Sequence, residues 1–261
     1  MGQASVCVVG AAGRMGERVR AALADHPDLA FARALEGPGH PAVGTRLADI
    51  PVVDDPASAL AGCDVAIDFS TPASTLLNLR AAADAGVAYV TGTTGFSEAE
   101  LAEIGALAER IPVLHAPNFS VSVNLLAWLV REAARKLGPG YDAELVELHH
   151  RAKRDAPSGT ALHLAAAVAE GRGQHLADHL VCAREGEIGA RPADAIGVQT
   201  LRGGDNPGEH SVFFIGQGER LELIHRASTR DHFAVGAVRS AAWLVGRAPG
   251  LHHIERVLGL A

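Results

Sequence analysis

The chain has 261 residues, of which 48% are hydrophobic and 20% are charged, so it can bury one large core or two modest ones, and we expect two domains. This composition excludes a disordered chain and a collagen-like chain. The formal charge is −7 and no stripe of Lys or Arg is present, which gives sequence-independent nucleic-acid binding little support.

The first part of the chain predicts strands that alternate with helices. Short apolar, β-branched runs predict strands, and alanine-rich periodic segments predict helices. In chain order we expect strand 5–9, helix 14–24, strand 29–35, strand 65–69, helix 72–85, strand 88–91, helix 97–110 and strand 111–115. Because strand–helix–strand crossovers are right-handed, this order predicts a Rossmann-like, doubly wound parallel sheet in an α/β fold.

The pattern changes after Asn118. We expect helix 121–137, strand 143–150, helix 158–169, strands 195–202, 209–216 and 220–227, and a closing helix 234–245. Glycine-rich turns join the late strands, which is typical of a mixed or antiparallel sheet in an α+β domain. We therefore predict one domain at 1–119, to which the region 231–261 returns, and a second domain at 120–230.

The cysteine spacing and the hydropathy pattern indicate in which cellular compartment the protein is expected. Cys7, Cys63 and Cys182 are widely spaced and form no CxxC pair, so neither a disulfide framework nor a cysteine zinc site is predicted. The sequence has no run of eighteen apolar residues. Its N-terminal segment has neither the basic region followed by a long apolar stretch nor the small-residue cleavage site that are typical of a leader. We expect a cytoplasmic protein.

The turn after the first predicted strand has the residue types of a dinucleotide-binding turn. Gly10, Gly13 and Gly16 have the spacing GxxGxxG, one residue away from the commoner GxGxxG. Small residues let the backbone come close to a pyrophosphate. The N-terminus of the following helix favours the negative charge of that pyrophosphate, and Arg14 can add a contact to it. Glu36 lies 20 positions beyond Gly16, where a carboxylate would bind the adenosine ribose and repel a 2′-phosphate. Glycine turns also occur for packing alone, so the flanking strands carry much of this prediction.

A second cluster of polar residues lies at 147–160, with two histidines, three basic side chains and a predicted helix start. Ser158 is a plausible N-cap, which leaves the backbone N–H groups of Gly159 and Thr160 available to a carboxylate. This pattern predicts an anion site.

Two other interpretations of this cluster stay open. It could be a solvated strand edge. Alternatively His149, His150 and His163 could ligate zinc, although no HExxH motif and no cysteine at ligand spacing accompany them.

Eight segments together resemble the dihydrodipicolinate reductase family, over nearly the whole chain. The longest of them, ELHHRAKRDAPSGTAL, contains the predicted anion site. The segments are VVGAAGRMG, DFSTP, GTTGF, APNFSVSVN, ELHHRAKRDAPSGTAL, GEHSVFF, HRAS and GAVRSAAWL.

This resemblance implies an enzyme, the NAD(P)H-dependent 4-hydroxy-tetrahydrodipicolinate reductase activity of lysine and diaminopimelate biosynthesis. It implies that His149 and Lys153 are catalytic and supply a proton, and that His150, Gly159 and Thr160 bind a small dicarboxylate cyclic imine. It implies a homotetramer formed through the sheet of the second domain, which becomes the substrate-binding and oligomerisation domain, and no metal. The cofactor residues that it implies are Gly10, Ala11, Ala12, Gly13, Arg14, Met15, Glu36, Gly92, Thr93, Thr94, Ala116, Pro117, Asn118 and Phe119.

Two departures from the family bear on the cofactor. Family members that accept NADPH often carry Arg just after the ribose-binding acid and in the DFTRP-type segment, where this chain has Gly37 and Thr71. Neither side chain can pair with a 2′-phosphate, so we expect NADH to be preferred over NADPH.

Two rival functions share the first domain. A semialdehyde dehydrogenase would need a catalytic cysteine or another base, and no cysteine lies at a suitable turn. A protein that only senses NAD(H) would have no use for His149, Lys153 or the helix start at Ser158.

Overall fold

The computed structural model describes residues 2–260 and divides into two compact units. The described residues through Val121, together with those from Asp231 onward, form the first unit, and Ser122–Arg230 form the second. Met1 and Ala261, the outermost residues of the predicted domains, lie outside the described residues.

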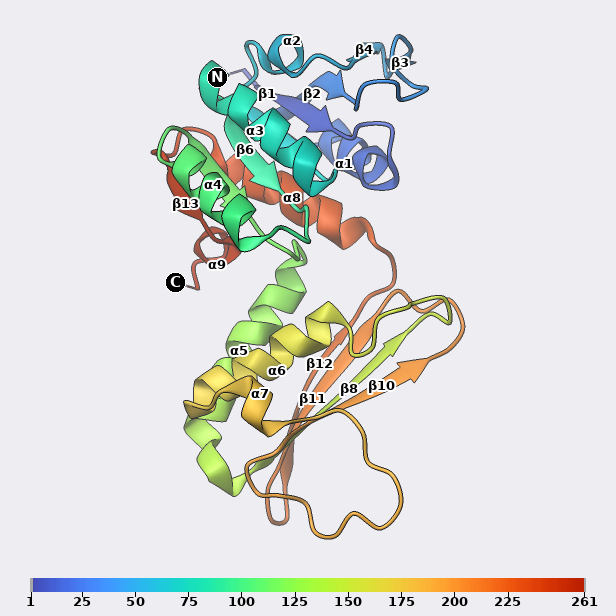
Figure 1. Ribbon diagram of the computed structural model, residues 1–261, viewed down its shortest axis with the longest axis vertical. Coiled ribbons are helices and arrows are strands. Elements are labelled where there is room, and N and C mark those ends of the chain that lie inside the picture. Colours follow the sequence, from blue (N-terminus) through green and yellow to red (C-terminus); the bar gives the residue numbers. More distant parts are fainter. Residues whose placement is uncertain (1, 261) are drawn as a thin grey trace. The chain divides into compact units, whose positions relative to one another are not determined.

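The first unit is built on one sheet, in which every neighbouring pair of strands is parallel except β3 and β4 (Figure 1). Its order is β13-β7-β6-β5-β1-β2-β4-β3, so the chain winds outward on both sides of β1. This arrangement confirms the predicted Rossmann-like, doubly wound class. The strands are β1 (Ala4–Val9), β2 (Leu29–Leu35), β3 (Arg46–Leu47), β4 (Ile50–Val53), β5 (Val65–Asp68), β6 (Ala88–Thr91), β7 (Pro112–His115) and β13 (Gly250–His252).

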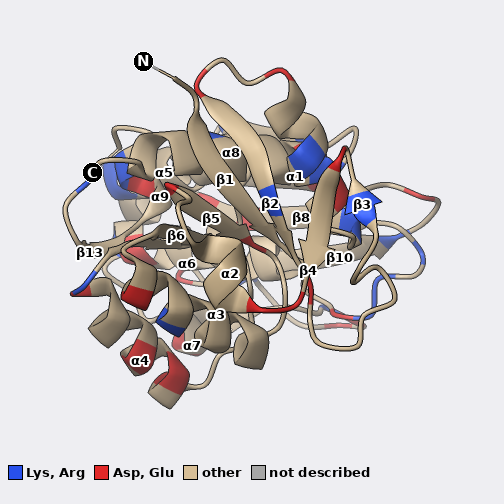
Figure 2. Cartoon of the chain, turned by 90° about the horizontal axis from the view of Figure 1, so that it is seen from above, with Lys and Arg blue, Asp and Glu red and all other residues tan. Residues whose placement is uncertain are grey.

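Helices cover both faces of this sheet, which explains why β1 is apolar along most of its length. Val6 and Val8 face a core that includes α1, α8 and α9, whereas Cys7 and Val9 face a core that includes α2, α3 and α4. Figure 2 shows several acidic positions along α4, which contains Glu98, Glu100 and Glu103. The helices are α1 (Arg14–Ala24), α2 (Pro56–Leu60), α3 (Pro72–Ala85), α4 (Glu98–Ala108), α8 (Asp231–Leu244) and α9 (Ile254–Val257).

The second unit has a mixed sheet of order β12-β11-β8-β10-β9, as predicted. β8 is parallel to β10 and antiparallel to β11, so it lies at the centre. One face of the sheet packs on α5 and α6 in a single core. The elements are α5 (Val121–Leu137), the 3-10 turn η1 (Gly138–Gly140), β8 (Asp142–His149), α6 (Gly159–Arg172), α7 (Leu176–His179), β9 (Leu180–Val181), β10 (Ile196–Arg202), β11 (Glu209–Ile215) and β12 (Arg220–Arg226).

The structure differs from the sequence prediction mainly in short elements and at element ends. β3, β4, β9, β13, α2, α7 and α9 have two to five residues, too few for a periodic pattern to be recognised. The strand predicted to include His150 ends at His149, because the His150 N–H turns away to the Asn206 carbonyl, 2.8 Å from it. Helix α6 continues past Ala169 to Arg172, where Gly173 caps it in the left-handed conformation.

Candidate active site

The glycine turn connects β1 to α1 in a conformation that requires small residues. Gly10 has a φ of +68°, which favours glycine, and its N–H donates to the Leu35 carbonyl over 2.9 Å. A Cβ on Gly16 would lie 2.1 Å from the Gly10 carbonyl oxygen, so α1 packs directly on the turn. Gly13 is the N-cap of α1 and provides no side-chain cap, so no side chain of the N-cap competes for the first N–H groups of the helix.

Glu36 lies directly after β2 and beside the glycine turn. Its carboxylate is buried, and Oε1 accepts the Ala12 N–H over 2.6 Å. The predicted ribose-binding acid and the predicted pyrophosphate-binding turn are thus in direct contact. Arg14 is exposed, and Met15 packs against the core of the unit.

The remaining predicted cofactor residues follow β6 and β7 at the same edge of the sheet, because the carboxyl ends of parallel strands share an edge. The triplet Gly92, Thr93, Thr94 follows β6, and a Cβ on Gly92 would overlap the Phe69 ring, 2.1 Å from Cε1. The run Ala116, Pro117, Asn118, Phe119 follows β7. Phe119 is buried and meets the Phe69 ring edge-on at 5.8 Å.

Buried hydrogen bonds connect the triplet Gly92, Thr93, Thr94 to Asp68. Asp68, at the end of β5, accepts hydrogen bonds from the Thr75 hydroxyl at 2.6 Å and the Tyr89 hydroxyl at 2.9 Å. Thr75 is also hydrogen-bonded to Thr93, with 2.9 Å between the two Oγ1 atoms. Burial raises the pKa of Asp68, although hydrogen bonds from Ser70, Thr75 and Tyr89 favour the charged form. Asp68 begins the DFSTP segment, but no role was predicted for it.

In the second unit, His149 ends β8 and contacts a buried carboxylate on its own strand. Its Nδ1 lies 2.5 Å from Glu147 Oε2, and both residues are buried. Arg202, the partner of His149 in β10, holds the same carboxylate with two hydrogen bonds of 2.9 and 3.0 Å. Glu147 lies in the predicted cluster 147–160 but no role was predicted for it, and Arg202 was not among the predicted site residues. Residues two apart in a strand share a face, and that spacing could have paired Glu147 with His149.

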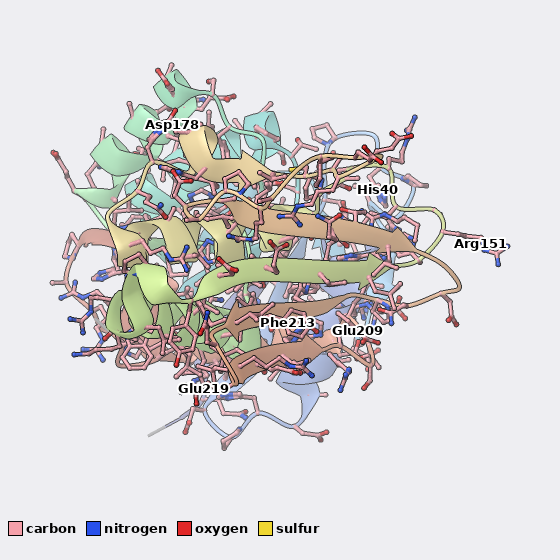
Figure 3. The ribbon with its side chains drawn as sticks, turned by 90° about the horizontal axis from the view of Figure 1, so that it is seen from below. His40, Arg151, Asp178, Glu209, Phe213 and Glu219 are labelled. Carbon is pink, nitrogen blue, oxygen red and sulfur yellow. The ribbon has the colours of Figure 1, made fainter. Side chains whose placement is uncertain are left out.

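The loop after β8 carries the basic side chains of the predicted anion site, and the structure separates them. Lys153 is largely buried, and its Nζ lies 2.9 Å from Asp155 Oδ1. His150 Nε2 lies 3.0 Å from Arg230 Nη2, and because a guanidinium only donates, this nitrogen accepts. Arg151 is exposed and points away from the loop (Figure 3), and Arg154 is exposed as well.

Helix α6 begins as predicted, with Ser158 as its N-cap. The Ser158 hydroxyl accepts the Ala161 N–H over 3.1 Å, and its backbone N–H donates to Glu147 Oε1 over 3.0 Å. Gly159 is exposed, and nothing lies within 4 Å of a Cβ placed on it, so the surroundings of this N-terminus are open. The Ser158 hydroxyl also lies 3.1 Å from Nε2 of the buried His210, a residue that sequence analysis assigned no role.

The ionisation of this cluster follows from burial and its charges. Burial lowers the pKa of His149, the Glu147 carboxylate opposes that effect, and Lys153 and Arg202 reinforce it. Burial works against the charge of Glu147, yet hydrogen bonds from Arg202, His149 and the Ser158 N–H bring its pKa below the ordinary value. Burial, together with the nearby His149, lowers the pKa of His210 to about 4. At neutral pH, His210 is therefore neutral and Glu147 is charged.

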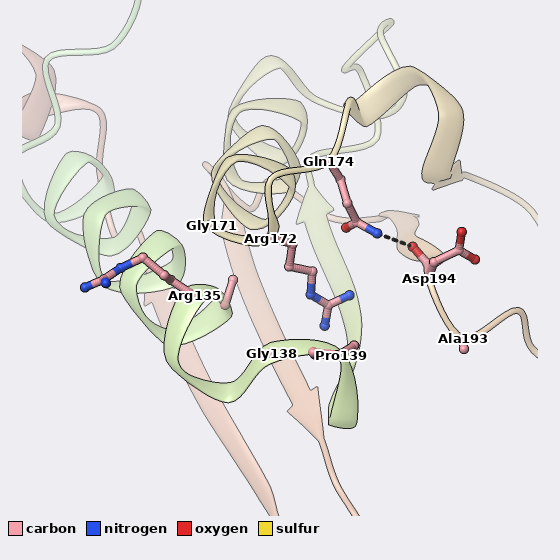
Figure 4. A pocket seen from close by; sticks show the side chains of 9 residues that line it. Arg135, Gly138, Pro139, Gly171, Arg172, Gln174, Ala193 and Asp194 are labelled. Carbon is pink, nitrogen blue, oxygen red and sulfur yellow. Dashed lines mark hydrogen bonds between the residues drawn. The ribbon is translucent and has the colours of Figure 1, made fainter.

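A separate cavity of about 380 Å³ lies at the other end of α6. Arg172 points into it while Arg135 turns away (Figure 4). Helix α6 has 14 residues, so this cavity is roughly 20 Å from Gly159 and contains none of the predicted site residues.

Residues 2–260 contain no group of three or more His, Cys, Asp or Glu side chains placed to hold a metal ion. None of their helices is both long and apolar enough to span a membrane.

Known proteins match nearly the whole chain. Residues 4–119 match the family model described as dihydrodipicolinate reductase, N-terminus, and residues 122–258 match the one described as dihydrodipicolinate reductase, C-terminus. The 4-hydroxy-tetrahydrodipicolinate reductase of Anaeromyxobacter dehalogenans is 49% identical over 98% of this chain and 97% of the relative. The enzyme of that name from Myxococcus xanthus is 48% identical over 97% of this chain and 96% of the relative.

Solved structures agree with this result. A dipicolinate-bound dihydrodipicolinate reductase from Paenisporosarcina sp. TG-14 matches with a TM-score of 0.81 and 26% identity, over 96% of this chain and 97% of the other. A scyllo-inositol dehydrogenase from Lactobacillus casei, with bound NAD(H) and scyllo-inositol, matches with a TM-score of 0.59 and 11% identity, over 93% and 88% of the two chains. The second likeness shows a shared fold alone.

We predict that His210 makes stability depend on pH. Its pKa is about 4 in the folded chain and about 6.5 in an unfolded chain, so the unfolded state binds more protons between these values. The stabilisation is complete above pH 6.5 and is lost as the pH falls toward 4, with a total on the order of 3 kcal/mol. Urea unfolding of wild type and His210→Gln at several pH values measures it. Wild type should lose more stability than the variant below pH 6.5, and parallel curves would contradict the prediction.

Proposed function

The chain belongs to the dihydrodipicolinate reductase family and is an NAD(P)H-dependent oxidoreductase of lysine and diaminopimelate biosynthesis, and we propose that it uses NADH, with Lys153 and His149 supplying the proton. One observation carries the proposal. The buried carboxylate of Glu147 contacts both His149 and the N-cap of α6, so a proton-transfer group and an anion-binding helix end belong to one cluster.

The residues of the first unit fit a nicotinamide dinucleotide. The φ of Gly10 and the close packing of Gly16 on the turn bring α1 directly behind it, so a pyrophosphate can approach the N–H groups that begin the helix. Glu36 would accept hydrogen bonds from the ribose hydroxyls, while Gly92 to Thr94 and Ala116 to Phe119 would hold the remainder of the cofactor. When bound, NADH would supply the hydride that is transferred to a ring carbon of the substrate.

Glu36 and Gly37 support NADH over NADPH. A 2′-phosphate would meet the carboxylate of Glu36, which repels it. Gly37 is exposed and has no side chain that could neutralise a phosphate, and Thr71 is occupied as the N-cap of α3.

The second unit would bind and protonate the substrate, a small cyclic imine with two carboxylates. The N–H groups of Gly159 and Thr160 at the start of α6 would bind one carboxylate, and His150 would contribute to binding. Hydride transfer to a ring carbon moves electron density toward the ring nitrogen, so the reduction also requires a proton. Lys153 carries a positive charge beside His149. A bound dianion would raise the pKa of His149 and so favour its protonated form, and this pair of residues can therefore supply the proton.

We also propose that the chain forms a homotetramer through the sheet of the second unit. The face opposite α5 and α6 presents Val146, Leu148, Phe213 and Ile224, which alternate with the core positions of their strands. Phe213 is labelled in Figure 3. The same face also carries polar side chains such as Asp142, Ser211 and Glu222, but large apolar side chains left half-buried or exposed on a sheet face are typical of a face that another subunit covers. A cytoplasmic location is proposed as well, since all three cysteines are free.

The experiment that tests the activity follows NADH oxidation with the product of dihydrodipicolinate synthase as substrate. We expect turnover by wild type and a loss of kcat/KM of roughly 100-fold or more in Lys153→Ala and in His149→Ala, because each removes a proton-transfer group. Lys136→Ala is the matched control, since Lys136 is exposed on α5 and is the only other lysine of the chain. Wild type without turnover would contradict the proposed function.

The same assay with NADPH tests the nucleotide. Wild type should have a higher kcat/KM with NADH, and Gly37→Arg should raise kcat/KM with NADPH by roughly tenfold, because a guanidinium can pair with the 2′-phosphate. Equal or better efficiency of wild type with NADPH would refute the preference.

The oligomer is tested by analytical ultracentrifugation. Wild type should sediment as about 108 kDa, four chains of 27.0 kDa, and Phe213→Asp should sediment as smaller species because it places a charge among the apolar side chains of this face. Leu77→Asp is the control, since Leu77 is an exposed leucine of α3 in the first unit. A monomeric wild type, or a tetrameric Phe213→Asp, would rule out the proposed interface.

A further inference from the structure

Glu147 is a buried charge whose contacts reach several elements of the second unit. Its side chain is 1% exposed. Its two oxygens interact with His149, with Arg202 through two bonds, with the Ser158 N–H and with the Thr200 hydroxyl. A carboxylate that bridges a strand, its neighbouring strand and a helix start can hold all three in one arrangement.

The contact with His149 determines which ring nitrogen carries a proton. Because Glu147 is charged, it can only accept, so Nδ1 of His149 is the donor and the neutral ring has its lone pair on Nε2. Nε2 faces Gly208, where a Cβ would lie 2.8 Å from it. Because residue 208 is glycine, it places no side chain against Nε2 of His149.

Arg202 keeps Glu147 both charged and oriented. Its guanidinium binds the carboxylate in a bidentate manner and also donates to the Asp155 carbonyl over 2.6 Å, which ties the Lys153 loop to the same pair. We propose that Glu147, held by Arg202, is a positioning residue that orients His149 through Nδ1 and aligns it with the N-terminus of α6. This inference rests on the proposed function, in which His149 takes part in proton transfer.

The charge of Glu147 also affects how His149 titrates. The titratable and charged groups that face His149 are Glu147 on its own strand, Lys153 in the next loop, Arg202 on β10 and His210 on β11. Among these, only Glu147 favours the protonated ring. Removing its charge therefore lowers the pKa of His149, and the loss of activity at high pH moves to lower pH.

The test compares Glu147→Gln with Glu144→Gln. Glu144 is also a carboxylate of β8 held by arginines, Arg184 and Arg191, but it lies on the opposite face of the strand. We expect kcat/KM of Glu147→Gln to fall roughly tenfold or more near neutral pH, with its high-pH limb shifted to lower pH and KM for NADH unchanged. The high-pH limb of the pH–activity profile of Glu144→Gln should coincide with that of wild type.

Nitrogen-15 NMR of the histidine rings gives a readout that does not need turnover, with His149→Gln used to assign the signal. In wild type we expect His149 to carry its proton on Nδ1, and in Glu147→Gln we expect its pKa to be lower. A wild-type ring protonated on Nε2 would overturn the inference even if Glu147→Gln failed to fold. Turnover with identical pH profiles for the two variants would also overturn it, whereas absence of turnover in wild type would refute the proposed function separately.

Discussion

The arrangement of the second unit depends on satisfying one buried charge. A carboxylate removed from water is costly unless it is paired and hydrogen-bonded, and Glu147 meets this requirement with partners from β10 and from the start of α6. Because those partners are needed for the charge to remain buried, His149, Arg202 and Ser158 are drawn to one place. The order of the cluster is thus a consequence of electrostatics as well as of packing.

The first unit also has a buried acid next to its predicted ligand-binding residues. Its predicted cofactor residues follow the carboxyl ends of parallel strands, which share an edge, and small residues allow close approach at Gly16 and Gly92. Behind Thr93, the buried hydroxyl of Thr75 connects to Asp68. In both units, a residue that is proposed to meet a ligand, Thr93 or His149, is hydrogen-bonded to a buried acid, through the Thr75 hydroxyl in the first unit and directly in the second.

The comparisons separate what the fold shows from what the chemistry requires. The scyllo-inositol dehydrogenase shares the fold at 11% identity, so the architecture by itself is compatible with several substrates. The family match covers both units, including the segment from Glu147 to Leu162. The proposed action on a dicarboxylate imine therefore depends on the side chains of the second unit, at the end of β8 and the start of α6.

The sequence by itself determined the alternation of strands and helices, the glycine turn, the position of Glu36 after the second strand and the N-cap Ser158, because periodicity, turn chemistry and capping act over a few residues. Only the tertiary structure decided that Arg202 pairs with Glu147, 55 residues away, and that His210 meets Ser158, 52 residues away. It also decided that Arg151 turns outward while Lys153 is largely buried. Contacts over such separations depend on which strands become neighbours and in which register, and no local pattern encodes that choice.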